Sequence, residues 1–418
     1  MPVAHPHGAA GRTRRSKPRW EVADVLRLHG EDYRRSHPLP LQHLKIMRAL
    51  SACRTPALGG HLERCGSCGF ERPAYNSCRN RHCPKCQSLA KARWLQARSA
   101  ELLPVGYFHV VFTLPHVLNP FILCNKAVVL KLLFDAAAQT LCAFGSDPRN
   151  GLGGKLGFLA VLHTWDQKLL DHFHLHCLIP AGVLSNDGRR WIHARSDFLF
   201  PVKALSKVFR GKLVAHLKKT FAQQKLIFPG RTADSGTQEG FSSLIAQLYQ
   251  KNWVVYCKPP FGGPRKVLDY LGRYTHRVAI ANHRIQSVKD GSVTFAYRDR
   301  SDGDKVKAMT VPAEEFIRRF LLHVLPASFM RIRHFGFLAN RCKGRDLHSC
   351  RLLLGLSPEI PEAEPMTTQE QVRELTGHDP MQCPACQSGV MKVVAELPRL
   401  PMHAWPLFPL PALRFDSS

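Results

Sequence analysis

Three histidines and two tyrosines are the residues of this chain whose types and spacing could do chemistry. His172, His174 and His176 alternate in the apolar segment HFHLHCLIPAG, and a strand would project all three from one face. Tyr270 and Tyr274 stand four residues apart in YLGRYTHR, and a helix would place both on one face. Imidazoles can hold a divalent metal, and a tyrosine hydroxyl can attack a phosphodiester. The combination predicts metal-assisted nicking and joining of a nucleic-acid strand.

Each pattern also has a structural alternative. Alternating histidines on a strand are often buried without binding a metal, and two tyrosines four apart are often a packing pair on an amphipathic helix. Charge favours the catalytic interpretation, because 59 Lys and Arg against 31 Asp and Glu give a net charge of +28. Such an excess suits a polyanionic partner, since each neutralised phosphate releases counterions. It is hard to reconcile with an enzyme of small molecules.

Binding to an anionic membrane is the alternative explanation of the positive charge. No uninterrupted apolar run reaches the roughly 18–20 residues that span a bilayer. The basic segment 1–20 lacks the apolar core of a secretory signal. We therefore expect a cytoplasmic protein that does not bind a membrane.

The fourteen cysteines indicate metal binding rather than disulfides, because several form Cys-X2-Cys pairs in a chain without a signal peptide. Two pairs separated by 14 residues, 69 to 82, have the spacing of a zinc ribbon: Cys65 with Cys68, and Cys83 with Cys86. His61 and Cys78 are further candidate ligands, and the spacing does not exclude a second ion. The alternative is a reduced, thiol-rich loop. We predict structural zinc on Cys65, Cys68, Cys83 and Cys86.

Basic residues surround these pairs: Arg64, Arg72, Arg79, Arg81, Lys85, Lys91, Arg93 and Arg98. They predict a module that contacts phosphate, and the alternative is a solvated basic face. One more pair, Cys383 and Cys386, has no obvious partner pair, so it makes only a weak case for zinc.

The elements that must position these residues follow from hydrophobic periodicity and turn signals. Strands are expected at 105–115, 157–165 and about 172–179, helices at 120–144, 203–226 and from about Pro312, and a hairpin turned at Asp290-Gly291. The predicted domains are a basic disordered arm (1–19), a helical and zinc-binding domain (20–104), a catalytic domain (105–345) and a Pro-rich C-terminal tail (346–418).

In these motifs the chain resembles the rolling-circle, two-tyrosine transposases of insertion sequences, members of the HUH nuclease superfamily. The shared features occur in one order: a cysteine-rich zinc module, Phe112-Thr113-Leu114, His174-Leu175-His176, and a helix with Tyr270 and Tyr274. The resemblance covers roughly residues 20–345. It implies an α+β fold with a central antiparallel sheet flanked by helices, preceded by a small cysteine-rich zinc domain. The strands at 107–114 and 172–179 would lie adjacent at its centre.

The chain departs from the family pattern at two points. Phe173 stands where the family often has proline, but its side chain would point away from the histidine face. Gly182-Val183 replaces a frequent double glycine, which affects the expected loop conformation and not the chemistry.

The resemblance further implies a catalytic magnesium or manganese ion on His174 and His176. A third ligand is usual in the superfamily; Gln167 is our choice, with Asp166 and His163 as alternatives. His172 would lie at the edge of the site, where it supports the ligands or contacts DNA.

The implied reaction is attack of Tyr270 or Tyr274 on DNA, which leaves a 5′-phosphotyrosine and a free 3′-hydroxyl. Two tyrosines allow two successive cleavages, one at each end of the moving strand. Arg273, His276 and Arg277 would hold phosphates or form a solvated basic face. The implied partner is DNA, chiefly the single-stranded ends of the element itself, and an oligomer is compatible with the pattern.

Two other functions stay open on the sequence. A replication initiator or relaxase would use the same chemistry, although the zinc module and the lack of helicase motifs argue against a relaxase. A zinc-dependent DNA-binding protein without catalysis would need the same residues only for structure.

Overall fold

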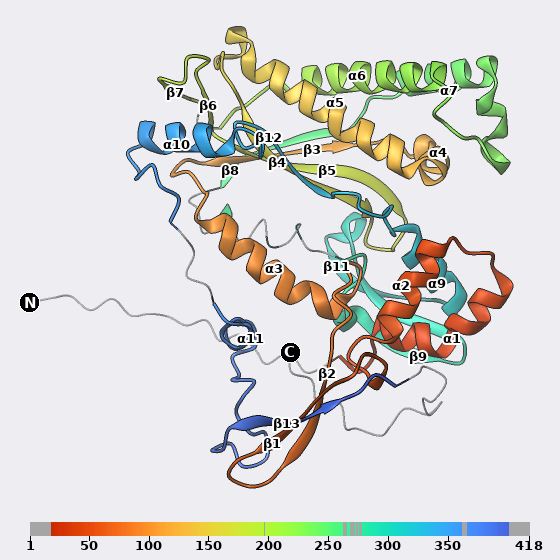
Figure 1. Cartoon of the computed structure of the whole chain (residues 1–418). Coiled ribbons are helices and arrows are strands. Elements are labelled where there is room, and N and C mark those ends of the chain that lie inside the picture. The colour runs from red at the N-terminus through yellow and green to blue at the C-terminus, as the bar shows by residue number, and fades with distance from the viewer. Residues whose placement is uncertain are drawn as a thin grey trace, which may run out of the picture.

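The protein is seen here in a computed structural model that describes residues 18–195, 197–261, 266, 267, 272, 275, 278–361 and 366–400. Long helices cover one face of a central sheet, and helix α3 crosses beneath the other face (Figure 1). The cysteine-rich strands and the C-terminal segment lie beyond α3. The predicted arm falls almost wholly outside the described residues.

The central sheet has five strands in the order β12-β4-β5-β3-β8, and all neighbours pair antiparallel. Their bounds are β3 Tyr107–Thr113, β4 Gly157–Trp165, β5 Asp171–Pro180, β8 Val255–Phe261 and β12 Ile332–Gly336. The central strand β5 pairs with β3 from Tyr107↔Pro180 to Thr113↔His174. The predicted α+β fold and the adjacency of the two motif strands are therefore confirmed.

One face of this sheet packs on helices because alternate residues of its strands are apolar. Phe173, Leu175 and Cys177 of β5 enter the main hydrophobic core. The helices that close this core are α4 Asn119–Cys124, α5 Lys126–Ser146, α6 Val202–Ala222 and α7 Gln238–Gln250. Helix α5 is long and apolar enough to cross a membrane, but 61% of its apolar window is buried inside the protein. It is a core helix by its packing.

The other face of the sheet carries the histidines between smaller apolar patches. Leu159, Val161 and Leu178 pack there with the buried Val267. Trp94 and Leu95 of α3 Pro84–Ser99 close the same cluster. This arrangement brings the zinc module and the segment around residue 267 onto the histidine-bearing face.

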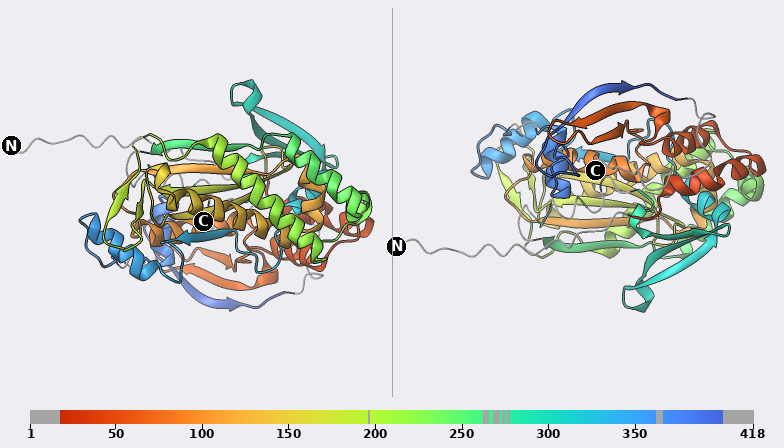
Figure 2. Two further views of the ribbon diagram at one scale, coloured as in Figure 1. Left: turned by 90° about the horizontal axis from the view of Figure 1, so that it is seen from above. Right: turned by 90° about the horizontal axis from the view of Figure 1, so that it is seen from below.

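A second core joins the N-terminus to a small sheet. Helices α1 Val22–Ser36 and α2 Leu41–Ser51 pack with α9 Ala313–Leu322 and with strands β9 Ile285–Lys289, β10 Ser292–Asp299 and β11 Lys305–Pro312. The predicted hairpin is confirmed: Asp290 and Gly291 have φ of 50° and 69°, as its tight turn requires. The β10–β11 hairpin, teal in Figure 2, projects from the body of the molecule.

The C-terminal part is more structured than a Pro-rich tail. Helices α10 Lys343–Leu353 and α11 Thr368–Thr376 are followed by β13 Met391–Leu397. Strand β13 pairs antiparallel with β1 Gly60–Cys65, which also pairs with β2 Glu71–Tyr75. A further small ladder joins β6 Gly182–Leu184 to β7 Trp191–His193. Segments 60–75 and 391–397 therefore share one three-stranded sheet.

Candidate nuclease site and metal centres

Three histidines converge on the face of the central sheet that lies opposite the helices of the main core. His174 and His176 lie on β5, and His163 lies beside them on β4, with one ring nitrogen of each within 4.8 Å of the others. Register explains the convergence: His163 pairs with His174, and Val161 pairs with His176, so all three side chains leave the same face. The structure thus brings together the two predicted ligands and one of the alternatives for the third.

Hydrogen bonds orient two of these rings. Nδ1 of His174 lies 2.8 Å from the carbonyl oxygen of His172, so this nitrogen carries the proton and donates it. Nδ1 of His176 lies 2.8 Å from Nε2 of His109 on β3. In both rings Nε2 is the nitrogen left for a metal, and such bonds to the remote nitrogen are typical of metal-ligating histidines.

Burial favours the neutral form of His174 and of His109. Loss of solvent, with the neighbouring His163 and His172, holds the pKa of His174 well below its ordinary value. Burial and the charge of Lys258 lower the pKa of His109 to about 4. Neutral imidazole is the form that binds a metal. Three nitrogen donors suit a first-row transition ion better than magnesium, which prefers oxygen.

The other predicted residues lie around this cluster. Gln167 is in the turn after β4, where its carbonyl oxygen accepts a hydrogen bond from Arg284. The Asp166 carboxylate accepts the backbone N–H groups of Lys168 and Leu170, which commits it to the same turn. His172 lies at the edge of the site with its ring centroid 4.6 Å from that of His174. The position of His172 agrees with the expectation.

The predicted nucleophiles Tyr270 and Tyr274 lie outside the described residues, as do Arg273, His276 and Arg277.

Three residues near the tyrosines in the sequence are described, and each has its own contacts. Val267 is buried against the histidine-bearing face. A methyl group at Gly272 would lie 3.1 Å from Cε of Lys91, so α3 packs closely on the chain there. The carbonyl oxygen of Thr275 accepts a hydrogen bond from Arg331.

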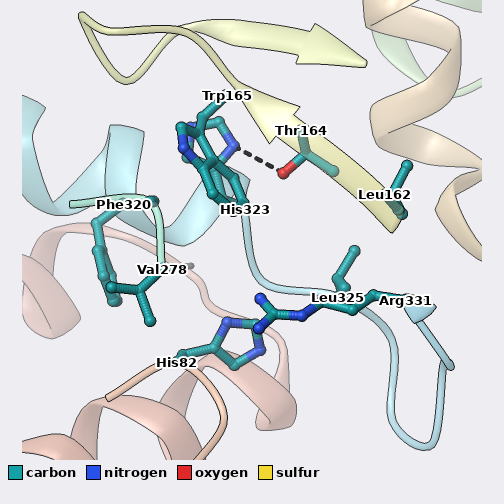
Figure 3. Close-up of a pocket in the computed structure, with 10 residues that line it drawn as sticks. His82, Leu162, Thr164, Trp165, Val278, Phe320, His323, Leu325 and Arg331 are labelled. Atoms are coloured by element: carbon teal, nitrogen blue, oxygen red, sulfur yellow. Dashed lines mark hydrogen bonds between the residues drawn. The ribbon is translucent and has the colours of Figure 1, made fainter. Parts of the chain in front are cut away.

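A small cavity marks the junction of the zinc module with the nuclease sheet (Figure 3). His82 of the zinc module points into it beside Arg331, and Thr164 of β4 bonds to His323 of the segment after α9 over 3.2 Å. Burial lowers the pKa of His82 and of His323 to about 3 and that of Arg331 to about 10. His82 and His323 are therefore neutral, and Arg331 is the charged residue among those that line the cavity.

The cysteines form two separate four-sulfur clusters. One contains Cys53, Cys78, Cys83 and Cys86, and the other contains Cys65, Cys68, Cys383 and Cys386. In the first, the Sγ atoms of Cys53 and Cys86 lie 3.6 Å apart, and those of Cys78 and Cys86 lie 3.7 Å apart. The edge of a tetrahedral zinc–thiolate site is about 3.8 Å, from Zn–S bonds of about 2.3 Å. This cluster fits zinc.

The two clusters correct the predicted grouping. All four predicted cysteines remain candidate ligands, but Cys65 and Cys68 do not share an ion with Cys83 and Cys86. Strand β1 and the turn after it carry the first pair away from the start of α3, where the second pair lies. The spacing of the two Cys-X2-Cys pairs along the sequence is that of a zinc ribbon, but it does not show that the two pairs lie apart in space.

Sequence reasoning missed two residues. Cys53 has no Cys-X2-Cys partner, so its spacing gave no signal, although it is a lone cysteine just before the zinc module. His109 alternates with the core residues Phe108 and Val110 on the strand next to the histidine motif, and that alternation is the signal that could have indicated it.

Most basic residues of the zinc module have partners within the protein. Arg81 donates to the carbonyl oxygens of Pro326 and Phe329, and Arg72 pairs with Glu63. Other pairs are Arg64–Glu71, Lys85–Glu21 and Arg98–Glu101. These residues serve packing of the module, so they are weaker candidates for phosphate contact than the sequence indicated.

Comparison with known proteins gives one consistent result. The chain matches the family model described as "Putative transposase" over residues 157–345, and that of a transposase zinc-binding domain over residues 25–114. Transposase y4qJ of Sinorhizobium fredii is 50% identical over 374 residues, which are 89% of this chain and 94% of the relative. The transposase for insertion sequence element IS801 of Pseudomonas savastanoi pv. phaseolicola is 27% identical over 368 residues, 84% of this chain and 83% of the relative. No solved structure matches the chain.

Proposed function

Because this chain belongs to the rolling-circle, two-tyrosine transposases of insertion sequences, we propose that it nicks and rejoins single-stranded DNA through a tyrosine nucleophile. The observation that carries this proposal is the convergence of His163, His174 and His176 on a sheet face that Val267 also contacts. Val267 belongs to the same stretch of sequence as the predicted nucleophiles, and its burial against this face supports the proposal.

We propose His163, His174 and His176 as the ligands of a catalytic divalent metal. His163 is preferred over Gln167 because its ring already lies within 4.8 Å of the other two. A bound ion would supply a Lewis acid that polarises the scissile phosphate. The nitrogen donor set favours manganese over magnesium in this role.

The tyrosine performs the covalent step. Its hydroxyl oxygen attacks phosphorus and loses its proton, and the bond from phosphorus to the 3′ oxygen breaks as that oxygen gains a proton. The products are a 5′-phosphotyrosine and a free 3′-hydroxyl. Attack of a 3′-hydroxyl on the phosphotyrosine reverses the chemistry and joins strands. A phenol has a pKa of about 10, so the site must favour its deprotonation at neutral pH.

The test is incubation of the protein with single-stranded DNA from the ends of its element, followed by a denaturing gel. A manganese-dependent band of protein bound to DNA, abolished by a chelator and by His174→Ala, supports the proposal. DNA binding without any covalent band in manganese or magnesium would favour the zinc-dependent binding protein instead.

A further inference from the structure

We propose that Cys65, Cys68, Cys383 and Cys386 bind a second structural zinc ion, which fastens the C-terminal segment 366–400 to the zinc module. The two family matches end at residues 114 and 345, so neither includes the second cysteine pair. The ion would join residues more than 300 positions apart in the chain. This inference does not depend on the nuclease chemistry.

Sulfur geometry is the first support. The Sγ atoms of Cys65 and Cys386 lie 3.7 Å apart, as do those of Cys68 and Cys383. A disulfide would need about 2.05 Å. The observed separations match the edge of about 3.8 Å in a tetrahedral zinc–thiolate site. The four thiols are spaced to share an ion and not to pair with each other.

Local backbone geometry is the second support. The N–H groups of Ser67 and Cys68 point at Sγ of Cys65, with N···S distances of 3.4 and 3.5 Å. The N–H group of Gly389 points at Sγ of Cys386 over 3.3 Å. Such bonds stabilise thiolates, the form that binds zinc. Each Cys-X2-Cys pair is therefore a turn whose amides face its own sulfur.

The third support is the small size of the local core. Its buried members are Cys65, Cys383 and Met391, with Phe70 and Cys386 packed partly against them. Half-buried and exposed residues dominate β13, where Val393 is 58% exposed. So few apolar side chains cannot hold a three-stranded sheet, and small modules of this kind need a metal or a disulfide. The distances between the sulfur atoms fit a metal site and not a disulfide.

The fastened segment reaches the helix that covers the nuclease face. Arg93 of α3 donates to the Gln371 side chain over 2.8 Å and to the Thr368 hydroxyl over 2.7 Å. Arg72 of β2 donates to the carbonyl oxygen of Pro380 over 2.6 Å. The segment that the ion would fasten therefore contacts α3 through α11, and α3 also packs against Gly272.

The test is the zinc content of the full-length protein, measured by atomic spectroscopy together with protein concentration. The double variant Cys383→Ser with Cys386→Ser should hold one zinc fewer than the wild type. Cys386→His, which keeps a zinc-binding side chain, should retain the ion. The matched control Cys124→Ser with Cys142→Ser changes two half-buried cysteines outside both clusters and should retain every zinc.

A second measurement does not depend on the variants being well folded. Cobalt substituted into the wild-type protein should give thiolate charge-transfer absorption for two four-sulfur sites per chain, and hydrogen exchange of β13 amides should speed up when zinc is removed. A wild-type absorption that accounts for one such site would overturn the proposal. So would a double variant with unchanged zinc content, or a disulfide found between these cysteines in protein purified under reducing conditions.

Discussion

At the level of single residues, the site depends on which ring nitrogen each histidine presents. The carbonyl oxygen of His172 and the ring of His109 each engage an Nδ1 atom of the motif histidines. Both bonds leave Nε2 as the nitrogen that can bind a metal. The three proposed ligands come from two strands, because His163 lies on β4 whereas His174 and His176 lie on β5.

Ligand substitution separates His163 from Gln167. We expect His163→Ala and His174→Ala to abolish metal-dependent cleavage of single-stranded DNA without loss of folding, because each removes a metal donor and not a member of the main apolar core. Gln167→Ala should retain most cleavage. Gel assays over a manganese titration, with circular dichroism as the folding control, give the answer. If Gln167→Ala is inactive and His163→Ala is active, the originally expected ligand is correct.

His109 should act through His176. Its removal in His109→Ala leaves Nδ1 of His176 without this partner, and loss of such a partner weakens metal binding by about 10- to 100-fold. The manganese concentration at half-maximal cleavage should rise by that factor, while saturating manganese restores most of the rate. His109→Gln can still accept the bond and should lie nearer the wild type. A lower maximal rate with no change in manganese dependence would contradict this role.

The sequence predicted His174 and His176 because alternation on one strand is a local pattern. Its choice of Gln167 over His163 and Asp166 had no firm basis, because the position of each side chain depends on the register between β4 and β5. His109 could not be assigned for the same reason, because its contact with His176 depends on the register between β3 and β5.

At the level of elements, the first cysteine cluster fixes α2, the loop before α3 and the start of α3. Cys53 follows α2, and Cys83 immediately precedes α3. Both are almost fully buried, and they pack in the second core with Val25 and Leu50. The metal site and the apolar core therefore support each other.

Loss of the first cluster should be costly. We expect Cys53→Ser to lose one zinc and to lower the melting temperature clearly, since structural zinc contributes directly to folding free energy. Zinc analysis and thermal unfolding measure both effects, with Cys142→Ser as the control. Unchanged zinc content in Cys53→Ser would remove this residue from the ligand set.

Several strands and helices of the central and small sheets were predictable because their apolar periodicity and turn residues are local. The hairpin at Asp290-Gly291 is the clearest case, because both residues adopt the positive φ that its turn demands. The β1–β13 pairing could not be predicted in this way. Its partners, Gly60 and Leu397 at one end, are separated by most of the chain.

At the level of the whole molecule, positive charge is the dominant property. The net charge of +28 is spread over a chain in which many basic residues of the zinc module already have internal partners. Binding of DNA should therefore draw on basic residues elsewhere as well.

Salt dependence measures this contribution. We expect affinity for single-stranded DNA to fall steeply with salt, with a slope of log K against log[salt] of about −0.7 for each phosphate neutralised. Fluorescence anisotropy with an end sequence and a scrambled sequence should give similar slopes, because the electrostatic part does not read sequence. A slope near zero would contradict a phosphate-binding surface.

The central claim is that a tyrosine of the segment 270–274 becomes covalently attached to DNA. The most direct test is mass spectrometry of the peptide–nucleotide adduct formed with manganese and single-stranded end DNA. We expect the nucleotide on Tyr270 or Tyr274, reduced adduct in each single Tyr→Phe variant and none in the double variant. The control Tyr256→Phe, which changes an exposed tyrosine of β8, should react normally. Adduct formation by the double variant, or a nucleotide on Tyr256 or Tyr297, would contradict the account.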